Sequence, residues 1–202
     1  PLTRRDYARD AAAQRKLAIA RLGLPIFVKP ANAGSSVGVG KARDEEALAA
    51  AIENAFRYDE KLVLEECIEG MEVECAVLGN EEPQASTVGE VVPCNDFYDY
   101  EAKYIANDSE LPIPARLPAE QLEAVRAAAC RVFTVMGCSG LARVDFFVRR
   151  EDGAVLLNEP NTIPGFTPIS MYPKLWAQSG LPYGELLDRL LRLALEKWEP
   201  NA

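Results

Sequence analysis

The sequence predicts an α+β fold with mainly antiparallel strand pairs. Helical segments and short β-rich runs alternate along the chain, and most neighbouring β-rich runs are joined by turns. The plainest pair is residues 142–148 and 154–162, which the polar turn at 149–153 joins into a hairpin. The chain has 202 residues, of which 49% are hydrophobic and 26% are charged. This length is enough for one large domain or two small ones, and the composition is that of an ordinary globular protein.

The N-terminal part reads as helix, strand, loop and helix. Residues 6–22 are rich in Ala, Arg and Lys, which predicts a helix that ends at Gly23. Residues 25–30 are β-rich and predict a short strand, whereas residues 31–40 are small and Gly-rich and predict a loop. A second helix is expected over residues 44–57, because acidic side chains in its first turn suit the helix dipole.

The rest of the chain adds strands, one long irregular segment and two helices. Strands are expected at residues 61–65, 72–78 and 87–92. Residues 93–117 show little periodicity, and a segment of this length without regular structure is usually functional or disordered. A helix is expected from Pro118 to about residue 136, followed by the hairpin, a Pro/Gly-rich turn at 163–165 and an amphipathic helix over 183–198.

Composition excludes several classes of function. The net charge of −9 argues against nucleic acid as a partner, because phosphate backbones need a basic surface. The absence of His excludes His-based triads and His–zinc sites in this chain.

The five cysteines sit in apolar runs without a C-x-x-C pair, which predicts buried free thiols in a reducing compartment. No apolar run is long enough to predict a membrane span. Because the first residue is Pro, we expect that the chain is part of a longer polypeptide or that an upstream segment was removed.

The hairpin carries the strongest chemical signal. It is expected to hold Asp145, Glu159 and Asn161 close together, with Arg143 beside them. Three oxygen ligands without His or Cys suit a hard cation such as Mg²⁺, which usually shares its coordination with substrate phosphates. The alternative is a set of surface acids, but Asp and Glu are unfavourable within β-rich runs unless they serve a purpose.

A lysine and a glycine-rich loop provide a second signal. Lys29 precedes the run of residues 34–40, whose glycines would let backbone N–H groups approach phosphate oxygens. The alternative is a simple turn between two strands. The run matches neither the Walker A pattern, since Gly40–Lys41 is followed by Ala42, nor the dinucleotide-binding fingerprint, which requires a third glycine at the start of a helix.

Two further segments are weaker signals. Acidic residues around 65–72 lie at a strand end and could bind an adenine amino group and a ribose diol, although composition alone favours solvated acids at a strand end. The aromatic run at 97–104 is either a surface loop packed by its own rings or a lid that closes over reactive phosphate and excludes water.

Taken together, these segments resemble the D-alanine–D-alanine ligases, a family of ATP-grasp enzymes. The matching strings cover nearly all of residues 10–198, and their order makes the resemblance specific. They are Phe-Val-Lys-Pro (27–30), Gly-Ser-Ser-Val-Gly (34–38), Phe-Tyr-Asp-Tyr-Glu-Ala-Lys-Tyr (97–104), Ala-Arg-Val-Asp (142–145), Asn-Glu (158–159), Asn-Thr (161–162), Pro-Gly-Phe-Thr (164–167) and Ile-Ser-Met-Tyr-Pro-Lys-Leu-Trp (169–176).

The resemblance implies an ATP-grasp fold in which two α/β subdomains with mainly antiparallel sheets grip ATP between them. It implies a small subdomain at residues 1–64 and a large one at residues 65–202, the latter with a flexible loop at 93–117. The full-length protein would be a cytoplasmic bacterial enzyme and a homodimer, with D-alanine as its small-molecule substrate and no nucleic acid or membrane partner.

The resemblance also implies a role for particular residues. The expected ATP-binding residues are Lys29, Ser36, Glu65, Glu66, Cys67, Ile68, Glu72, Lys103, Asn158 and Glu159. The ligands expected for two Mg²⁺ or Mn²⁺ ions are Asp145, Glu159 and Asn161. The residues expected to bind substrate or stabilise the reaction are Ser35, Lys103, Tyr104, Arg143, Gly165 and Ser170.

The implied chemistry is phosphorylation of one D-alanine carboxylate by ATP, followed by attack of a second D-alanine amine on the acyl phosphate. Related enzymes add D-lactate or D-serine instead, and other ATP-grasp ligases or a non-catalytic nucleotide-binding module remain alternatives.

Two features depart from the family pattern. Pro160 stands between two expected ligands and fits a strand only at an edge or bulge. The family's N-terminal domain is absent from this sequence, so we expect the isolated chain to be inactive or nearly so.

Overall fold

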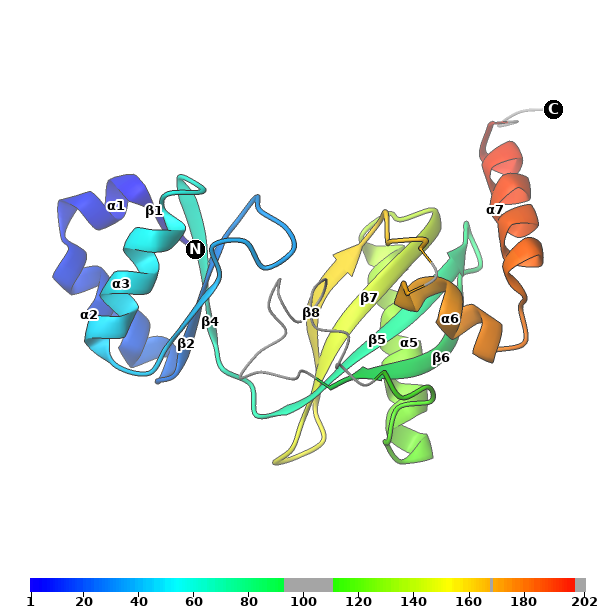
Figure 1. The fold of residues 1–202 in the computed structure, drawn as a ribbon, viewed down its shortest axis with the longest axis horizontal. Helices are drawn as coiled ribbons and strands as arrows, with labels where there is room; N and C mark the ends of the chain where they lie inside the picture. Colours follow the sequence, from blue (N-terminus) through cyan, green and yellow to red (C-terminus); the bar gives the residue numbers. More distant parts are fainter. Residues whose placement is uncertain (93–110, 168, 199–202) are drawn as a thin grey trace. The chain divides into compact units, whose positions relative to one another are not determined.

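A computed structural model describes residues 1–92, 111–167 and 169–198, which form two compact units (Figure 1). The described part of the first unit is Pro1–Ile68, and the second unit begins at Glu69. Strand β4 (Lys61–Glu66) continues through the expected subdomain boundary at 64/65, so the chain leaves the first unit only after this strand ends. Lys103 and Tyr104, together with the rest of the aromatic run at 97–104, lie outside the described residues.

The first unit is a four-stranded antiparallel sheet packed against helices. Its elements are β1 (Leu2–Thr3), α1 (Arg4–Arg9), α2 (Ala11–Leu22), β2 (Ile26–Pro30), β3 (Gly40–Ala42), α3 (Glu45–Ala55) and β4, and the strand order is β1-β4-β2-β3. Strand β2 lies between β3 and β4, and its alternate residues Ile26 and Val28 are fully buried. They pack with Leu48 and Ile52 of α3, as the alternation of strand side chains requires.

The single helix expected over residues 6–22 is interrupted at Asp10, which the prediction missed. The Asp10 backbone leaves the helical region, at φ −161° and ψ 84°, and its side chain accepts a hydrogen bond from the Ala13 N–H at 2.9 Å. Asp10 therefore caps α2, as Thr3 caps α1. Aspartate competes for backbone N–H groups in this way, which makes it a better cap than a helix-interior residue.

The second unit is built on a second antiparallel sheet. Its elements are β5 (Gly70–Gly79), β6 (Gln84–Val91), α5 (Ala119–Val135), β7 (Gly140–Arg149), β8 (Val155–Asn161), α6 (Met171–Gln178) and α7 (Tyr183–Trp198), and the strand order is β6-β5-β7-β8. The predicted hairpin is confirmed as β7 and β8, with β8 at the edge of the sheet. This edge position explains why Pro160, which lacks an N–H, is compatible with the strand.

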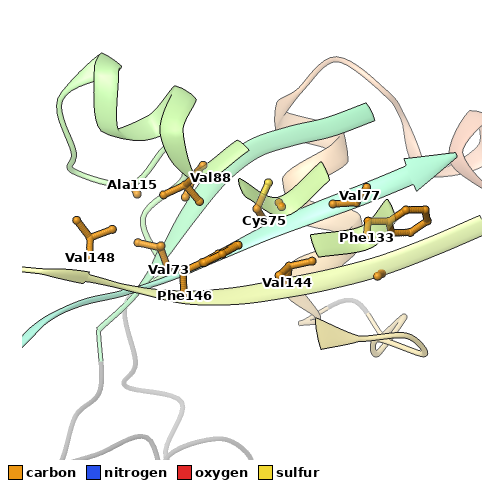
Figure 2. Packing of buried hydrophobic residues seen from close by; sticks show 12 residues of the cluster. Val73, Cys75, Val77, Val88, Ala115, Phe133, Val144, Phe146 and Val148 are labelled. Carbon is orange, nitrogen blue, oxygen red and sulfur yellow. The ribbon is translucent and has the colours of Figure 1, made fainter. Parts of the chain in front are cut away.

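Helices cover the sheet of the second unit on both faces. Figure 2 shows the core on one face, where Val73 and Cys75 of β5 and Phe146 of β7 pack with Phe133 of α5. On the other face, α6 covers β5 and β6, and the Tyr172 hydroxyl donates to the Val77 carbonyl at 3.0 Å. Helix α6 was not predicted from the sequence. Its Pro173 sits in the first helical turn, where a missing N–H costs no intrahelical bond, so a helix is possible there.

The cysteines agree only in part with the expectation of buried thiols. In the part of the chain that the structure describes, four are free, and of these Cys75 is buried, whereas Cys67, Cys130 and Cys138 are partly exposed. Burial raises the pKa of the Cys75 thiol to about 12, so it stays protonated and behaves as an apolar core residue. No helix in the described residues combines the length and apolar character that a membrane span requires.

Candidate active site

Four polar residues of the hairpin meet on one face of the second unit's sheet. Asp145 lies opposite Glu159, and Arg143 lies opposite Asn161, in the register of β7 with β8. The Asn161 amide nitrogen donates to Asp145 at 2.9 Å and to Glu159 at 3.5 Å. Asp145 is 3% exposed, whereas Glu159 is on the surface. The structure therefore brings together the three expected cation ligands and the arginine predicted to accompany them.

A β-bulge sets the direction of Glu159. Phe146 pairs with Leu157, but Asp145 pairs with Glu159, so Asn158 is an extra residue in β8. In an uninterrupted ladder Asn158 would lie opposite Asp145, and Glu159 would turn to the core face beside Val144. The bulge at Asn158 therefore places the carboxylates of Asp145 and Glu159 on the same face. Sequence alternation alone would not have predicted this arrangement.

Arg143 is held tightly within the cluster. Its Nε and Nη2 donate to the two oxygens of Asp145, both at 2.8 Å, and Nε also lies 3.1 Å from Glu74 Oε2. Burial works against its positive charge, but the hydrogen bonds with Asp145 and the nearby charges of Glu74 and Glu159 outweigh it and raise the pKa of Arg143. Arg143 therefore stays cationic, and no described residue bonds with its Nη1.

Glu74 is a member of this cluster that the sequence analysis missed. It lies on β5 directly opposite Asp145, and only 6% of its surface is exposed. The sequence did contain a signal for Glu74, because it is an acid two residues after Glu72 in a run that is otherwise largely apolar. Glu72, the expected ribose-binding acid, lies on the same strand face, two residues earlier.

The donor set fits a hard divalent cation, although an amide must supply one ligand. Among the described residues there is no group of three or more His, Cys, Asp and Glu side chains arranged around one metal position. Asp145 and Glu159 supply carboxylate oxygens, and Asn161 can supply its amide oxygen once the side-chain amide is flipped. Three carboxylates and one guanidinium leave two excess negative charges in the cluster, which favours a cation.

Gly165 and Ser170 flank a turn at the start of α6. The Ser170 hydroxyl accepts from the Thr167 N–H at 3.0 Å and lies 2.8 Å from the Thr167 hydroxyl. A Cβ at position 165 would come within 2.8 Å of Ser170 Oγ, so glycine allows the serine to approach the backbone there. These two residues of the predicted substrate site are thus brought into contact.

In the first unit, Lys29 and Glu65 form an ion pair on neighbouring strands. Lys29 Nζ lies 2.5 Å from Glu65 Oε2, on the facing strands β2 and β4. The Cys67 N–H donates to the Pro25 carbonyl at 3.2 Å, just after Glu66 at the end of β4. The pairing supports a lysine held in place by Glu65, and the expected role of Glu65 in ATP binding stays a prediction. The expected roles of Glu66, Cys67 and Ile68 stay predictions.

The predicted glycine-rich loop links β2 to β3 through a tight turn. Ser35 and Ser36 have φ values of 52° and 60°, and the Val37 N–H donates to the Gly34 carbonyl at 3.1 Å. Positive φ at both central residues is the pattern of a type I′ turn, which is unusual for serine. Backbone strain of this kind is concentrated at functional sites, so the geometry supports a role for Ser35 and Ser36 beyond a simple turn.

Comparison with known proteins places the chain in a family. A family model described as "D-ala D-ala ligase C-terminus" matches residues 1–192. The chain belongs to this family. A D-alanine–D-alanine ligase of Acetivibrio thermocellus is 57% identical over 181 residues, which are 90% of this chain and 48% of the relative. One from Ruminiclostridium cellulolyticum is 59% identical over 89% of this chain and 48% of its own length.

Solved ligase structures confirm the ATP-grasp fold predicted from the sequence. The D-alanine-D-alanine ligase of Coxiella burnetii superposes with a TM-score of 0.81 at 40% identity, over 97% of this chain and 51% of that protein. The VanG D-Ala:D-Ser ligase of Enterococcus faecalis gives a TM-score of 0.83 at 41% identity, over 95% and 55%. This member of the D-Ala D-Ala ligase C-terminus family thus spans about half the length of the relatives it matches.

Proposed function

We propose that this chain is the C-terminal portion of an ATP-dependent ligase that joins two D-alanines through an acyl-phosphate intermediate, for cell-wall precursor synthesis. The observation that carries the proposal is the hairpin cluster, in which the Asn161 amide bonds with both Asp145 and Glu159 beside an arginine that pairs with Asp145. Relatives named D-alanine–D-alanine ligase, at more than half identity over most of this chain, support the reaction.

In this proposal the second unit binds the cations and the reacting carboxylate. Asp145, Glu159 and Asn161 would hold one or two Mg²⁺ or Mn²⁺ ions, which neutralise phosphate charge when bound. Arg143 is held by two carboxylates, so its Nη1 is available to bind an oxygen that becomes negative as the amine attacks. The Gly165 backbone and Ser170 would bind substrate near the start of α6.

The first unit would contribute the groups that contact the nucleotide. Lys29 supplies a positive charge for the ATP phosphates, and its ion pair with Glu65 restricts the direction of the side chain. The turn from Gly34 to Val37 includes the strained Ser35. Its backbone N–H groups would approach the phosphate oxygens closely, as in other phosphate-binding loops. Phosphoryl transfer needs positioning and charge neutralisation more than covalent catalysis, and these residue types supply both.

The relatives are named for two different acceptor amino acids. The named D-Ala:D-Ser ligase is about as similar to this chain as the D-alanine-D-alanine ligase of Coxiella, so D-serine is a specific second acceptor. We favour D-alanine because the curated relatives with the higher identities carry that name. We also propose a cytoplasmic homodimer, as the resemblance to these ligases suggests.

Product analysis tests the proposal directly. A polypeptide that joins this chain to the preceding half found in its relatives is incubated with ATP, Mg²⁺ and D-alanine, D-serine or D-lactate, and ADP and ligated product are measured. We expect D-alanyl-D-alanine as the main product. Glu159→Gln should lower turnover by at least about 100-fold, since metal-held charge is lost at the phosphoryl group.

A matched control separates the cluster from surface charge in general. Glu151 lies in the exposed turn of the same hairpin, so Glu151→Gln should retain the wild-type rate. ADP release that does not depend on any of the three acceptors would contradict the ligase proposal. Equal rates for Glu159→Gln and wild type would contradict the assignment of Glu159 as a ligand.

A further inference from the structure

Glu74 occupies a confined position in the sheet of the second unit. It lies on β5, with Asp145 opposite it on β7 and Gly89 opposite it on β6. A side chain at Gly89 would collide with α6, because an ideal Cβ there lies 2.9 Å from a Leu175 methyl carbon and 3.1 Å from the sulfur of Met171. Apolar side chains of α6 therefore lie on the side of Glu74 toward β6, whereas Arg143 and Asp145 lie on the side toward β7.

A carboxylate in such surroundings needs a charged partner. Glu74 is 6% exposed, and burial of an ionised carboxylate without a charged partner is strongly unfavourable. Arg143 supplies the partner, with Nε 3.1 Å from Glu74 Oε2. The same Nε donates its single hydrogen to Asp145 Oδ1 at 2.8 Å, so its contact with Glu74 on the neighbouring strand is an ion pair and not a second hydrogen bond. Arg143 is fixed from two directions instead of one.

We propose that Glu74 is a positioning residue of the ligase site, and the proposal rests on the function proposed above. Glu74 fixes the Arg143 guanidinium on the sheet, and thereby fixes the direction of the Nη1 edge, which no described residue binds. It also takes up part of the guanidinium charge. Asp145 is consequently paired less strongly with Arg143 and keeps electron density available for a divalent cation.

Removal of the Glu74 charge should therefore weaken cation binding in two ways. Arg143 would pair with Asp145 alone, which reduces the ability of Asp145 to bind a cation. The negative charge of the cluster would also fall from two excess charges to one, which weakens its attraction for any cation. A role confined to fold stability would produce neither effect.

A second buried ion pair in the same unit offers a matched control. Glu90 is 5% exposed and pairs with Arg116 through Nε at 2.8 Å and Nη2 at 2.7 Å. Glu90→Gln thus removes a comparable buried charge from a different pair. Both Gln variants should lower the melting temperature, so thermal unfolding alone does not distinguish the roles of Glu74 and Glu90.

Binding of Mn²⁺ alone, measured from the electron paramagnetic resonance signal of free Mn²⁺, provides a readout besides activity. In the full-length protein, Glu74→Gln should weaken Mn²⁺ binding about tenfold or more and lower kcat at saturating Mg²⁺ about tenfold or more, with the KM for ATP within about threefold of wild type. Glu90→Gln should keep the wild-type Mn²⁺ affinity.

Glu74→Asp separates charge from position, and it also serves if the Gln variant fails to fold. It keeps the charge but shortens the side chain, so Mn²⁺ affinity should stay within about threefold of wild type while kcat falls, because Arg143 is held less firmly. Wild-type values of both quantities in Glu74→Gln, or equal loss of Mn²⁺ affinity in the Asp and Gln variants, would overturn the inference. Absence of D-alanine-dependent ADP release in the wild type would instead overturn the proposed function.

Discussion

Asp145 and Glu159 lie directly opposite each other on β7 and β8 because Asn158 forms a bulge between Leu157 and Glu159. The bulge takes up one residue of β8, so the two carboxylates share the polar face although strict alternation would turn Glu159 to the core. The pairing predicts that register, more than the identity of residue 158, determines cation binding at this edge of the sheet.

A deletion and an insertion test this prediction. Deletion of Asn158 makes the ladder regular and leaves Glu159 opposite Asp145, so Mn²⁺ affinity should stay within about tenfold of wild type. Insertion of one glycine between Asn158 and Glu159 displaces the ligand from register and should abolish measurable Mn²⁺ binding. If the deletion abolishes binding while circular dichroism shows an intact fold, the bend of the strand is the determining feature.

The hairpin itself was predictable from the sequence, whereas the details of its cluster were not. Two β-rich runs and a polar turn identified β7 and β8, and the acids in these runs led to the prediction of a cation site. The bulge depends on how two strands pair, and Glu74 belongs to a strand distant in sequence. Contacts across a sheet are long-range, so a local pattern indicates which residues are polar but not which of them meet.

The glycine-rich loop predicts a contrast between two glycines. Gly38 has φ +73°, and a Cβ there would lie 2.5 Å from the Tyr58 ring and 2.9 Å from Pro30. Gly38→Ala should therefore lower the free energy of unfolding by about 1–3 kcal/mol, through left-handed backbone strain and overlap with Tyr58. Gly34 has open space around its ideal Cβ, so Gly34→Ala should change stability by no more than about 0.5 kcal/mol in urea unfolding.

A second substitution checks the cause of the Gly38 effect. The Tyr58 side chain is 53% exposed and belongs to the surface beside the loop. Tyr58→Ala should recover part of the stability lost in Gly38→Ala, because it removes the overlap but not the strain. Additive effects of the two substitutions would show that the contact with Tyr58 contributes nothing.

Strain at Ser35 predicts a stabilising substitution. Its φ of 52° favours glycine, so Ser35→Gly should raise the free energy of unfolding by up to about 1 kcal/mol. Ser35→Ala keeps the Cβ but removes the hydroxyl, and the difference between the Gly and Ala variants in urea unfolding isolates the backbone contribution. Lower stability of the Gly variant than of the Ala variant would contradict a strained turn.

The differences between the predicted and observed folds have a common physical origin. The helix break at Asp10 depends on one side chain that prefers to cap, and α6 depends on burial of Tyr172 and Leu175 against the sheet. Strand β1 has two residues, too few for a periodic signal, and exists because Leu2 pairs with Leu62. Long periodic segments such as α5 were predictable, but elements created by tertiary contacts were not.

The Glu90–Arg116 pair predicts a specific dependence of stability on pH. Hydrogen bonds from Arg116 lower the pKa of Glu90 against the opposing effect of burial, from an ordinary value of 4.5. A carboxyl group whose pKa is lower in the folded state stabilises the fold above the unfolded pKa, and this contribution is lost as pH falls through the folded pKa. The acid limb of the stability curve should therefore contain a contribution from Glu90.

Thermal unfolding between pH 7 and pH 3 measures this contribution. Because the Arg116 side chain is 58% exposed, Glu90→Gln should cost only about 1–2 kcal/mol at pH 7. Below pH 4.5 the difference from wild type should shrink, because the wild-type carboxyl group also becomes neutral. Glu123 pairs with Arg126 on the surface, with 69% of its side chain exposed, so Glu123→Gln should leave the pH profile unchanged. A constant difference between Glu90→Gln and wild type at every pH would mean that packing of the side chain, and not its charge, stabilises this pair.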